Sequence, residues 1–150
     1  MKKYLFPIVV SLCLGIFMSF VIIHQYESLD GITVSNEAKK IYFIQRGSYA
    51  EKNNMEEDMK NFKNYIFNVE DNMYHAYIAL TSSKENSNKI MEMYKSQNIE
   101  TIEKEKIVDN SEFIEVLNQY DRLLSKTDDS ETIKTIINQI LSKYEEYVNG

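Results

Sequence analysis

Two short segments of the sequence combine aromatic side chains with neutral polar ones. The segments cover residues 43–49 and 73–78, and their side chains of this kind include Phe43, Gln45, Ser48, Tyr74 and Tyr77. An aromatic ring can cover the C–H face of a sugar, and amide or hydroxyl groups can bond its hydroxyl rim. Neutral groups suit an uncharged saccharide better than a basic patch would.

The sequence offers few groups for metal binding or catalysis. Beyond residue 23 it contains only two histidines, His24 and His75, and no cysteine, so no tetrahedral metal site can be assembled there. No Gly-rich phosphate loop, Ser-His-Asp set or nucleophile elbow is present. A carboxylate pair acting on a glycosidic bond stays open in principle, although no pair stands out. We therefore expect no enzyme activity, no metal and no cofactor.

The elements that must position these residues alternate between strands and helices. We expect strands at 41–46, 65–69, 73–80 and within 99–108, because these runs are rich in β-branched and aromatic residues. Two capping boxes, Ser48–Glu51 and Ser82–Glu85, lie 34 residues apart and predict the starts of two helices. The order βαββαβ predicts an α+β fold of the split βαβ type, with an antiparallel sheet and both helices on one face.

Strict alternation predicts which side chains of the third strand share a face. One face would carry Tyr74, Ala76, Ile78 and Leu80, and the other His75, Tyr77 and Ala79. In the first strand, Phe43 and Gln45 would lie on one face, and Ile44 and Arg46 on the other.

The N-terminus has the pattern of a membrane anchor. Lys2 and Lys3 precede an uncharged run over 4–23, which at about 1.5 Å per residue matches the hydrocarbon core of a bilayer. The positive-inside rule places the lysines in the cytoplasm and the rest of the chain outside. A cleaved signal peptide is the alternative, but the span ends in bulky residues where cleavage needs small ones.

The anchor also carries a pattern typical of helix pairing in membranes. Ser11, Gly15 and Ser19 are spaced four apart on one helical face and could support weak dimerisation.

The part beyond the anchor is acidic. It has 15 basic and 23 acidic residues, a net charge of −8, and such a surface repels phosphate backbones. An aromatic sheet face could also suit RNA, but the charge and the external location argue against a nucleic-acid partner.

The last 42 residues, 109–150, predict a helical hairpin. Apolar residues recur at helical spacing in two stretches, from Phe113 to Leu124 and from Ile133 to Val148, with a polar turn at 126–130. Each apolar stripe must be buried against the other helix, the preceding domain or a partner protein. The sequence leaves these three possibilities open.

The segment Gln45-Arg46-Gly47-Ser48-Tyr49 resembles the opening of a SPOR domain, the sporulation-related, peptidoglycan-binding module of bacteria. Further similarities are Asn54 near the first helix start, the aromatic third strand, and Ser83-Lys84-Glu85 at the second helix. The resemblance covers about residues 40–106. His75 and Ala79 depart from the family's pattern, which usually has Arg and Gly there, and Arg46 replaces an apolar residue.

The resemblance implies a binding function. SPOR domains bind glycan strands stripped of stem peptides, often at division or sporulation septa, on the helix-free face of the sheet. The glycan-binding residues implied here are Phe43, Gln45, Ser48 and Tyr74, with Tyr77 as a rival platform to Tyr74. If the C-terminal hairpin covered that face, glycan binding would be blocked.

The expected organisation is a cytoplasmic tail (1–3), a transmembrane anchor (4–23), a tether (24–40), a SPOR-like domain (41–108) and a helical hairpin (109–150). The expected function is that of a single-pass membrane protein that binds peptidoglycan glycan outside the cell membrane, at sites of wall remodelling. The alternative is an interaction module that no longer binds glycan and holds a partner protein on its C-terminal helices. A wall hydrolase is disfavoured by the missing motifs.

Overall fold

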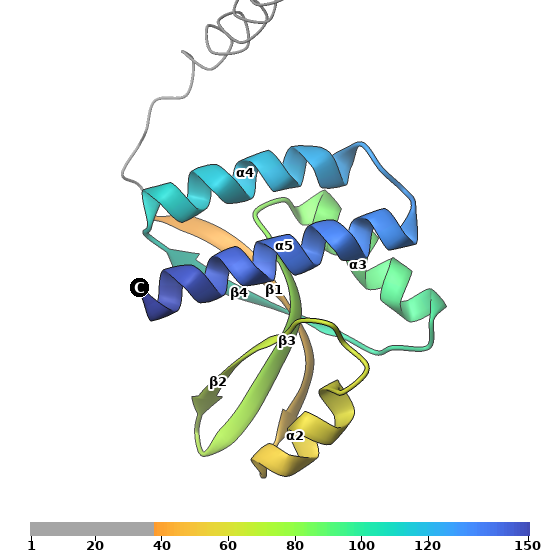
Figure 1. The fold of residues 1–150 in the computed structure, drawn as a ribbon, viewed down its shortest axis with the longest axis vertical. Coiled ribbons are helices and arrows are strands. Elements are labelled where there is room, and N and C mark those ends of the chain that lie inside the picture. Colours follow the sequence, from red (N-terminus) through yellow and green to blue (C-terminus); the bar gives the residue numbers. More distant parts are fainter. Residues whose placement is uncertain (1–37) are drawn as a thin grey trace, which may run out of the picture. The chain divides into compact units, whose positions relative to one another are not determined.

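The computed structural model describes residues 38–150, which form four strands and four helices (Figure 1). In chain order these are β1 (Lys39–Tyr49), α2 (Lys52–Met59), β2 (Ile66–Glu70), β3 (Met73–Thr81), α3 (Lys84–Ser96), β4 (Ile102–Val108), α4 (Ser111–Ser125) and α5 (Ser130–Asn149). The predicted α+β class is confirmed. The predicted tail, anchor and small-residue pattern lie outside the described residues, as does the tether up to residue 37.

The four strands form one sheet in the order β2-β3-β1-β4, and every neighbouring pair is antiparallel. With the element order βαββαβ, this is the predicted split βαβ arrangement. Within residues 38–150, no helix has both the length and the apolar character needed to cross a bilayer.

Strand β1 is longer than predicted at both ends. It takes in Lys39 and Lys40, which the tether was expected to contain, and it continues to Tyr49. The predicted capping box at Ser48 is therefore wrong. Ser48 pairs with His75 in β3, so the strand's ladder prevails over a helix start, and α2 begins at Lys52 without a side-chain cap.

The second predicted helix is present, but its N-cap lies one residue later than expected. Ser83 is the N-cap of α3, and its hydroxyl accepts a hydrogen bond from the Asn86 amide. After α3, Asn98 adopts a positive φ of 59° and the amide of Ile99 donates to the carbonyl of Tyr94. These residues complete the helix end, so β4 begins only at Ile102 and occupies the later part of the predicted range 99–108.

Two irregularities in the β1–β3 ladder change which side chains share a face. Ile44 pairs with Ala79, but the next residue, Gln45, pairs with Tyr77. Successive residues of a strand point to opposite faces, so Ala79 and Tyr77 lie on opposite faces although they are two residues apart. The predicted alternation over 73–80 is therefore wrong at this bulge.

Helices α2 and α3 lie on the face of the sheet that carries Ile44 and Arg46. Asp58 of α2 accepts hydrogen bonds from Arg46 (3.2 Å) and from Tyr49. Glu103 of β4 pairs with Ile44 and so shares its face, and it accepts hydrogen bonds from Lys84 and Ser87 of α3. Both predicted helices thus share one face, as expected.

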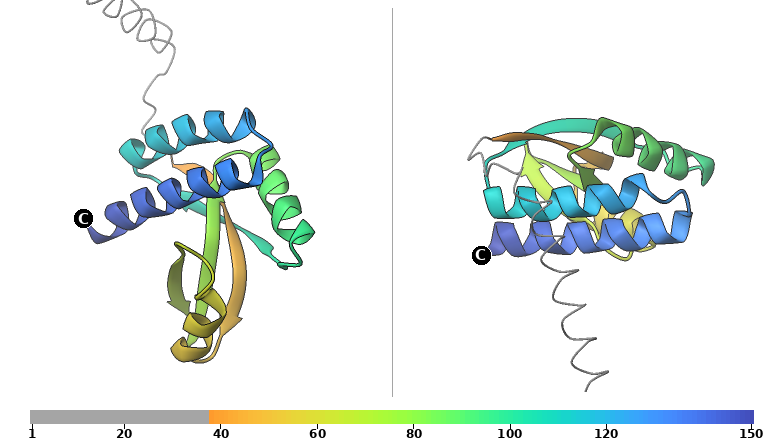
Figure 2. Two further views of the ribbon diagram at one scale, coloured as in Figure 1. Left: turned by 45° about the vertical axis from the view of Figure 1, so that its right-hand side comes forward. Right: turned by 90° about the horizontal axis from the view of Figure 1, so that it is seen from above.

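The C-terminal helices α4 and α5 lie side by side next to the sheet (Figure 2). Helix α5 contacts β3, and α4 contacts α3. Their apolar stripes join the same core as the sheet and include Phe113, Leu117, Leu124, Ile137 and Ile140. Of the burial sites left open by the sequence, the structure uses the other helix and the preceding domain.

Candidate functional site

The structure brings four of the five predicted glycan-binding residues to one face of the sheet. Phe43 and Gln45 are two apart in β1, and Tyr77 pairs with Gln45. The Gln45 Nε2 atom donates to Ser48 Oγ over 2.7 Å, which places Ser48 beside them. We call Phe43, Gln45, Ser48 and Tyr77 the predicted sugar face.

Tyr74 does not belong to this group. It pairs with Tyr49, whose hydroxyl donates to Asp58 of α2. The Tyr74 ring instead lies 6.1 Å from the ring of Phe67 in β2. The choice between Tyr74 and Tyr77, which the sequence left open, is decided here by the bulge: Tyr77 is the tyrosine beside Gln45.

Most of the predicted sugar face is buried. The exposed fraction is 1% for Phe43, 3% for Gln45 and 3% for Tyr77. The Phe43 ring packs edge-on against Tyr77 and against Tyr144 of α5, each with centroids 5.4 Å apart. Helix α5 therefore covers the aromatic part of this face, and Ser48 is the one member that stays exposed.

A lysine that the sequence analysis did not single out also covers this face. The Lys106 Nζ atom of β4 lies 5.2 Å from the ring centre of Phe43 and 4.6 Å from that of Tyr77. Burial lowers the pKa of Lys106, and nearby Glu70 opposes this shift. Cation–π contacts of this kind stabilise packed aromatic rings, so each of the two rings already has Lys106 as a partner.

A polar cluster lies beside the buried rings. The His75 Nδ1 atom is 2.8 Å from Ser48 Oγ and 3.5 Å from Gln45 Nε2. Two buried oxygens, Gln45 Oε1 and Asn68 Oδ1, have no hydrogen-bond partner among the described residues. Such acceptors are costly to bury, and a ligand hydroxyl or amide could satisfy them.

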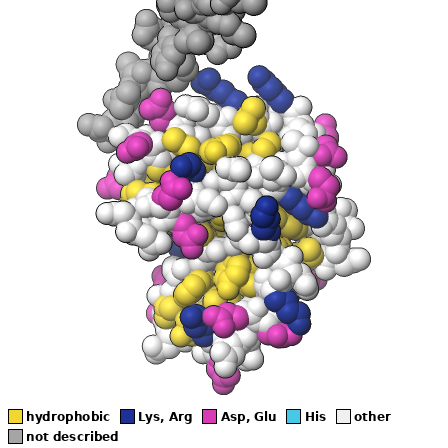
Figure 3. Space-filling model, viewed as in Figure 1, with side chains coloured by type: hydrophobic (Ala, Val, Ile, Leu, Met, Phe, Trp, Pro, Cys, Tyr) yellow, Lys and Arg dark blue, Asp and Glu magenta, His cyan; other side chains and the backbone are white. Residues whose placement is uncertain are grey.

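An aromatic cavity of about 560 Å³ remains between the sheet and the second half of α5. Its lining includes Phe43, Tyr65, Asn68, Tyr77 and Tyr144. In the space-filling view, hydrophobic side chains gather on the surface below the α4–α5 layer (Figure 3). Helix α5 covers most of the predicted sugar face, and this cavity is the part of the region that it leaves open.

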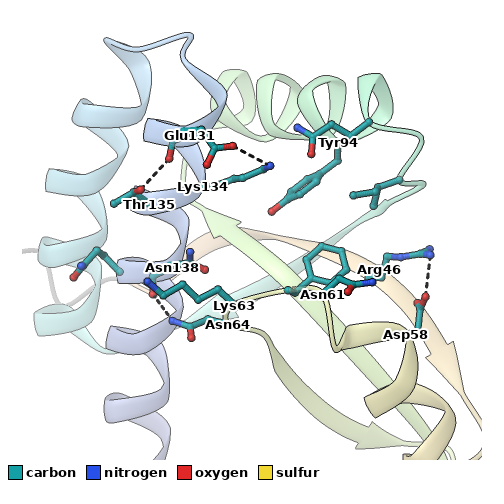
Figure 4. A pocket seen from close by; sticks show the side chains of 14 residues that line it. Arg46, Asp58, Asn61, Lys63, Asn64, Tyr94, Glu131, Lys134, Thr135 and Asn138 are labelled. Atoms are coloured by element: carbon teal, nitrogen blue, oxygen red, sulfur yellow. Dashed lines mark hydrogen bonds and ion pairs between the residues drawn. The ribbon is translucent and has the colours of Figure 1, made fainter.

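A second cavity, of about 530 Å³, lies between α3, the loop after α2 and the first half of α5. We call it the polar cavity (Figure 4). Its lining includes five carboxamide side chains, those of Asn61, Asn64, Gln97, Asn138 and Gln139. These residues come from three separate segments, so nothing in the sequence indicated that they would meet.

The charged groups of the polar cavity are largely paired. Arg46 lies 3.2 Å from Asp58, and Lys134 lies 3.4 Å from Glu131. Lys63 also lines the cavity, and no ion pair involves it in the described part of the chain. Four of the five charged side chains are thus paired, which leaves the neutral carboxamides as the main groups available to a polar ligand.

The described residues contain no group of three or more His, Cys, Asp or Glu side chains that could hold a metal ion. No protein-family model, no curated protein and no solved structure matches the chain. The geometry and chemistry of the two cavities are therefore the basis for a functional proposal.

Proposed function

We propose that this chain is a membrane-tethered binding module, located outside the cell membrane, whose principal ligand is a protein. Residues 4–23 would provide the membrane anchor, and residues 38–150 the binding unit. The resemblance of 45–49 to a SPOR domain supports a scaffold of that kind. Nothing in this function requires catalysis.

The observation that carries the proposal is the burial of Phe43, Gln45 and Tyr77. Sugar binding on an aromatic platform needs an exposed ring face. Here Phe43 is 1% exposed and meets Tyr144 of α5 edge-on, while Lys106 lies over the rings of Phe43 and Tyr77. The chain's own side chains occupy the place that a glycan would need.

The apolar stripes of the hairpin are not the partner's docking site in this proposal. The alternative derived from the sequence had a partner held on the apolar stripes of α4 and α5. Those stripes lie in the core, with Leu117, Ile137 and Ile140 at most 1% exposed, so a partner must use another surface.

One observation favours glycan binding as a second candidate function. The buried Gln45 Oε1 and Asn68 Oδ1 atoms lack partners, and Ser48 beside them is exposed. A glycan hydroxyl could donate to these oxygens if the end of α5 moved away from Tyr77. This candidate requires a rearrangement, whereas protein binding does not.

A pelleting assay separates the two functions. The full chain, purified in a mild detergent, would be mixed with peptidoglycan sacculi that have or have not been treated with an amidase. We expect the same small amount of protein to pellet with both, because the predicted sugar face is closed. Photocrosslinking from surface positions in intact cells should give adducts that protease removes and lysozyme does not.

The variant Gln45→Ala and the control Asn88→Ala complete the design, since Asn88 is an exposed carboxamide on α3. Pelleting that depends on amidase treatment, disappears in Gln45→Ala and persists in Asn88→Ala would overturn the protein-binding proposal in favour of glycan.

A further inference from the structure

The polar cavity has the features of a site for peptide main chain. We propose that it binds an extended segment of a partner protein and reads mainly the segment's backbone. This inference rests on the proposed function, because it names the part of the partner that would be recognised. It uses none of the residues of the predicted sugar face.

The first feature is a set of unused hydrogen-bonding groups. The side chains of Asn61, Gln97, Asn138 and Gln139 line the cavity but make no hydrogen bond within residues 38–150. A carboxamide offers both donors and an acceptor, and a peptide group offers one of each. Each of these side chains can therefore pair with a peptide group in both directions.

Asn64 differs from the other carboxamides because it holds the cavity together. Its Nδ2 atom donates to the Asn138 carbonyl and to Ser142 Oγ, each over 3.1 Å. These bonds join the loop after α2 to α5. The cavity is thus formed before a ligand arrives, which reduces the entropy lost on binding.

The second feature is the hydroxyl of Tyr94. Figure 4 shows this side chain extending from α3 with its hydroxyl toward the space between α3 and α5. The hydroxyl has no hydrogen-bond partner among the described residues. Burial raises the pKa of Tyr94 to about 12, so the group stays protonated and can donate to a carbonyl oxygen.

The spacing of polar residues on α5 fits an extended chain. Glu131, Thr135 and Gln139 line the cavity one helical turn apart, at a rise of about 6 Å per four residues. Residues on one side of an extended peptide recur every ~6.6 Å. The helix can therefore present a polar group to every second residue of the bound segment.

The same cavity suits a saccharide less well. Its aromatic side chains are Phe62 and Tyr94, whose rings pack against each other with centroids 6.2 Å apart. Tyr94 is only 4% exposed, so it offers an edge and a hydroxyl rather than an open ring face. A sugar would find hydrogen bonds here without a stacking platform.

The test uses a phage library of random linear peptides, panned against the full chain in a mild detergent. Selected peptides would be synthesised and their affinities measured by fluorescence anisotropy. We expect Tyr94→Phe and Asn138→Ala each to weaken binding by about fivefold to tenfold, the usual effect of one lost hydrogen bond. The exposed Asn88→Ala control should bind as the unmodified chain does.

Backbone recognition is tested with peptides that carry N-methyl groups at alternating positions. We expect one of the two N-methylation patterns to weaken binding about tenfold, because it removes the peptide N–H groups that face the cavity. Equal affinity for both patterns would show that side chains alone are read and would overturn the inference.

Two further outcomes count against the inference. Peptides whose affinity is the same for the unmodified chain and both cavity variants would place the binding elsewhere. A chitin oligosaccharide that binds, and loses affinity in Tyr94→Phe and Asn138→Ala, would make the cavity a sugar site. Neither result depends on Gln45, so failure of this inference can be distinguished from Gln45-dependent pelleting, which would overturn the proposed function.

Discussion

At the scale of single residues, Asp121 connects the C-terminal hairpin to the sheet. This aspartate of α4 is 7% exposed. Its carboxylate accepts hydrogen bonds from the Ser82 amide (2.8 Å), the Ser82 hydroxyl (2.7 Å) and the Thr81 hydroxyl. The Asn86 Nδ2 atom donates to the Asp121 carbonyl and carboxylate. One side chain thus joins α4 to the end of β3 and the start of α3.

We expect Asp121→Ala to lower the free energy of unfolding by about 3 kcal/mol, because it leaves several buried donors without an acceptor. Urea denaturation of the full chain would measure this loss. The matched control is Asp128→Ala, since that side chain is 94% exposed and pairs with Lys89 at the surface. The control should change stability little, and equal effects of the two substitutions would contradict the expectation.

At the same scale, Gly47 lies close to another side chain. Its backbone conformation does not itself call for glycine, because no glycine in the described residues has a positive φ. A Cβ atom on Gly47 would lie 2.5 Å from the Tyr49 hydroxyl oxygen. A side chain at position 47 would therefore displace the Tyr49 ring, whose hydroxyl donates a hydrogen bond to Asp58.

At the scale of elements, the β2–β3 hairpin depends on its two-residue turn. Asp71 and Asn72 have φ values of 52° and 58°, in the left-handed region that a type I′ turn requires at both central positions. Asparagine tolerates this conformation better than most residues, and glycine better still.

We expect Asn72→Ala to destabilise the chain by about 1 kcal/mol, because alanine disfavours a left-handed conformation. Asn72→Gly should preserve or raise stability, since glycine is preferred at the second position of this turn. Thermal unfolding followed by circular dichroism should rank the melting temperatures as Gly, Asn and then Ala. An alanine variant as stable as the glycine variant would contradict the assigned turn.

Helix α5 has two roles along its length. Its second half covers Phe43 through Tyr144, and its first half forms one wall of the polar cavity. The apolar stripe with Ile133, Ile136 and Ile140 fixes the helix in the core, which leaves its opposite side free to present polar groups. The same amphipathic pattern therefore closes one surface and builds another.

At the scale of the whole molecule, residues 38–150 fold around one shared core. The buried cluster contains Phe43 and Leu80 from the sheet together with Leu117, Leu124 and Ile137 from the hairpin. The sheet and its two helices would expose much apolar surface without α4 and α5. The hairpin therefore belongs to the folded unit rather than forming an appendage.

We expect a chain that ends at Asp109 to show no cooperative thermal transition, because the helices that bury Phe43 and Leu80 of the sheet would be missing. Circular dichroism and calorimetry would measure this against the full chain. A cooperative transition together with pelleting on amidase-treated sacculi would instead make the hairpin a removable cover over a functional glycan site.

The sequence by itself determined the order and type of the elements. Its periodicities predicted four strands, two helices between them and a final helical hairpin, because the apolar spacing of a strand or helix is a local property. It also placed Arg46 on the helix side of the sheet, where the structure pairs it with Asp58. The start of α3 was predicted to within one residue for the same reason, since capping joins residues three apart, although the cap is Ser83 and not the expected Ser82.

Only the tertiary structure decided what became of the predicted sugar face. Because of a bulge between Gln45 and Gly47 and a register shift at Ile78, Tyr77 and not Tyr74 lies beside Gln45. The docking of α5 then buried Phe43 against Tyr144. An apolar stripe indicates that a helix must be covered, but not by which surface. The polar cavity likewise joins Asn61, Gln97 and Asn138, whose approach depends on long-range packing that no local pattern encodes.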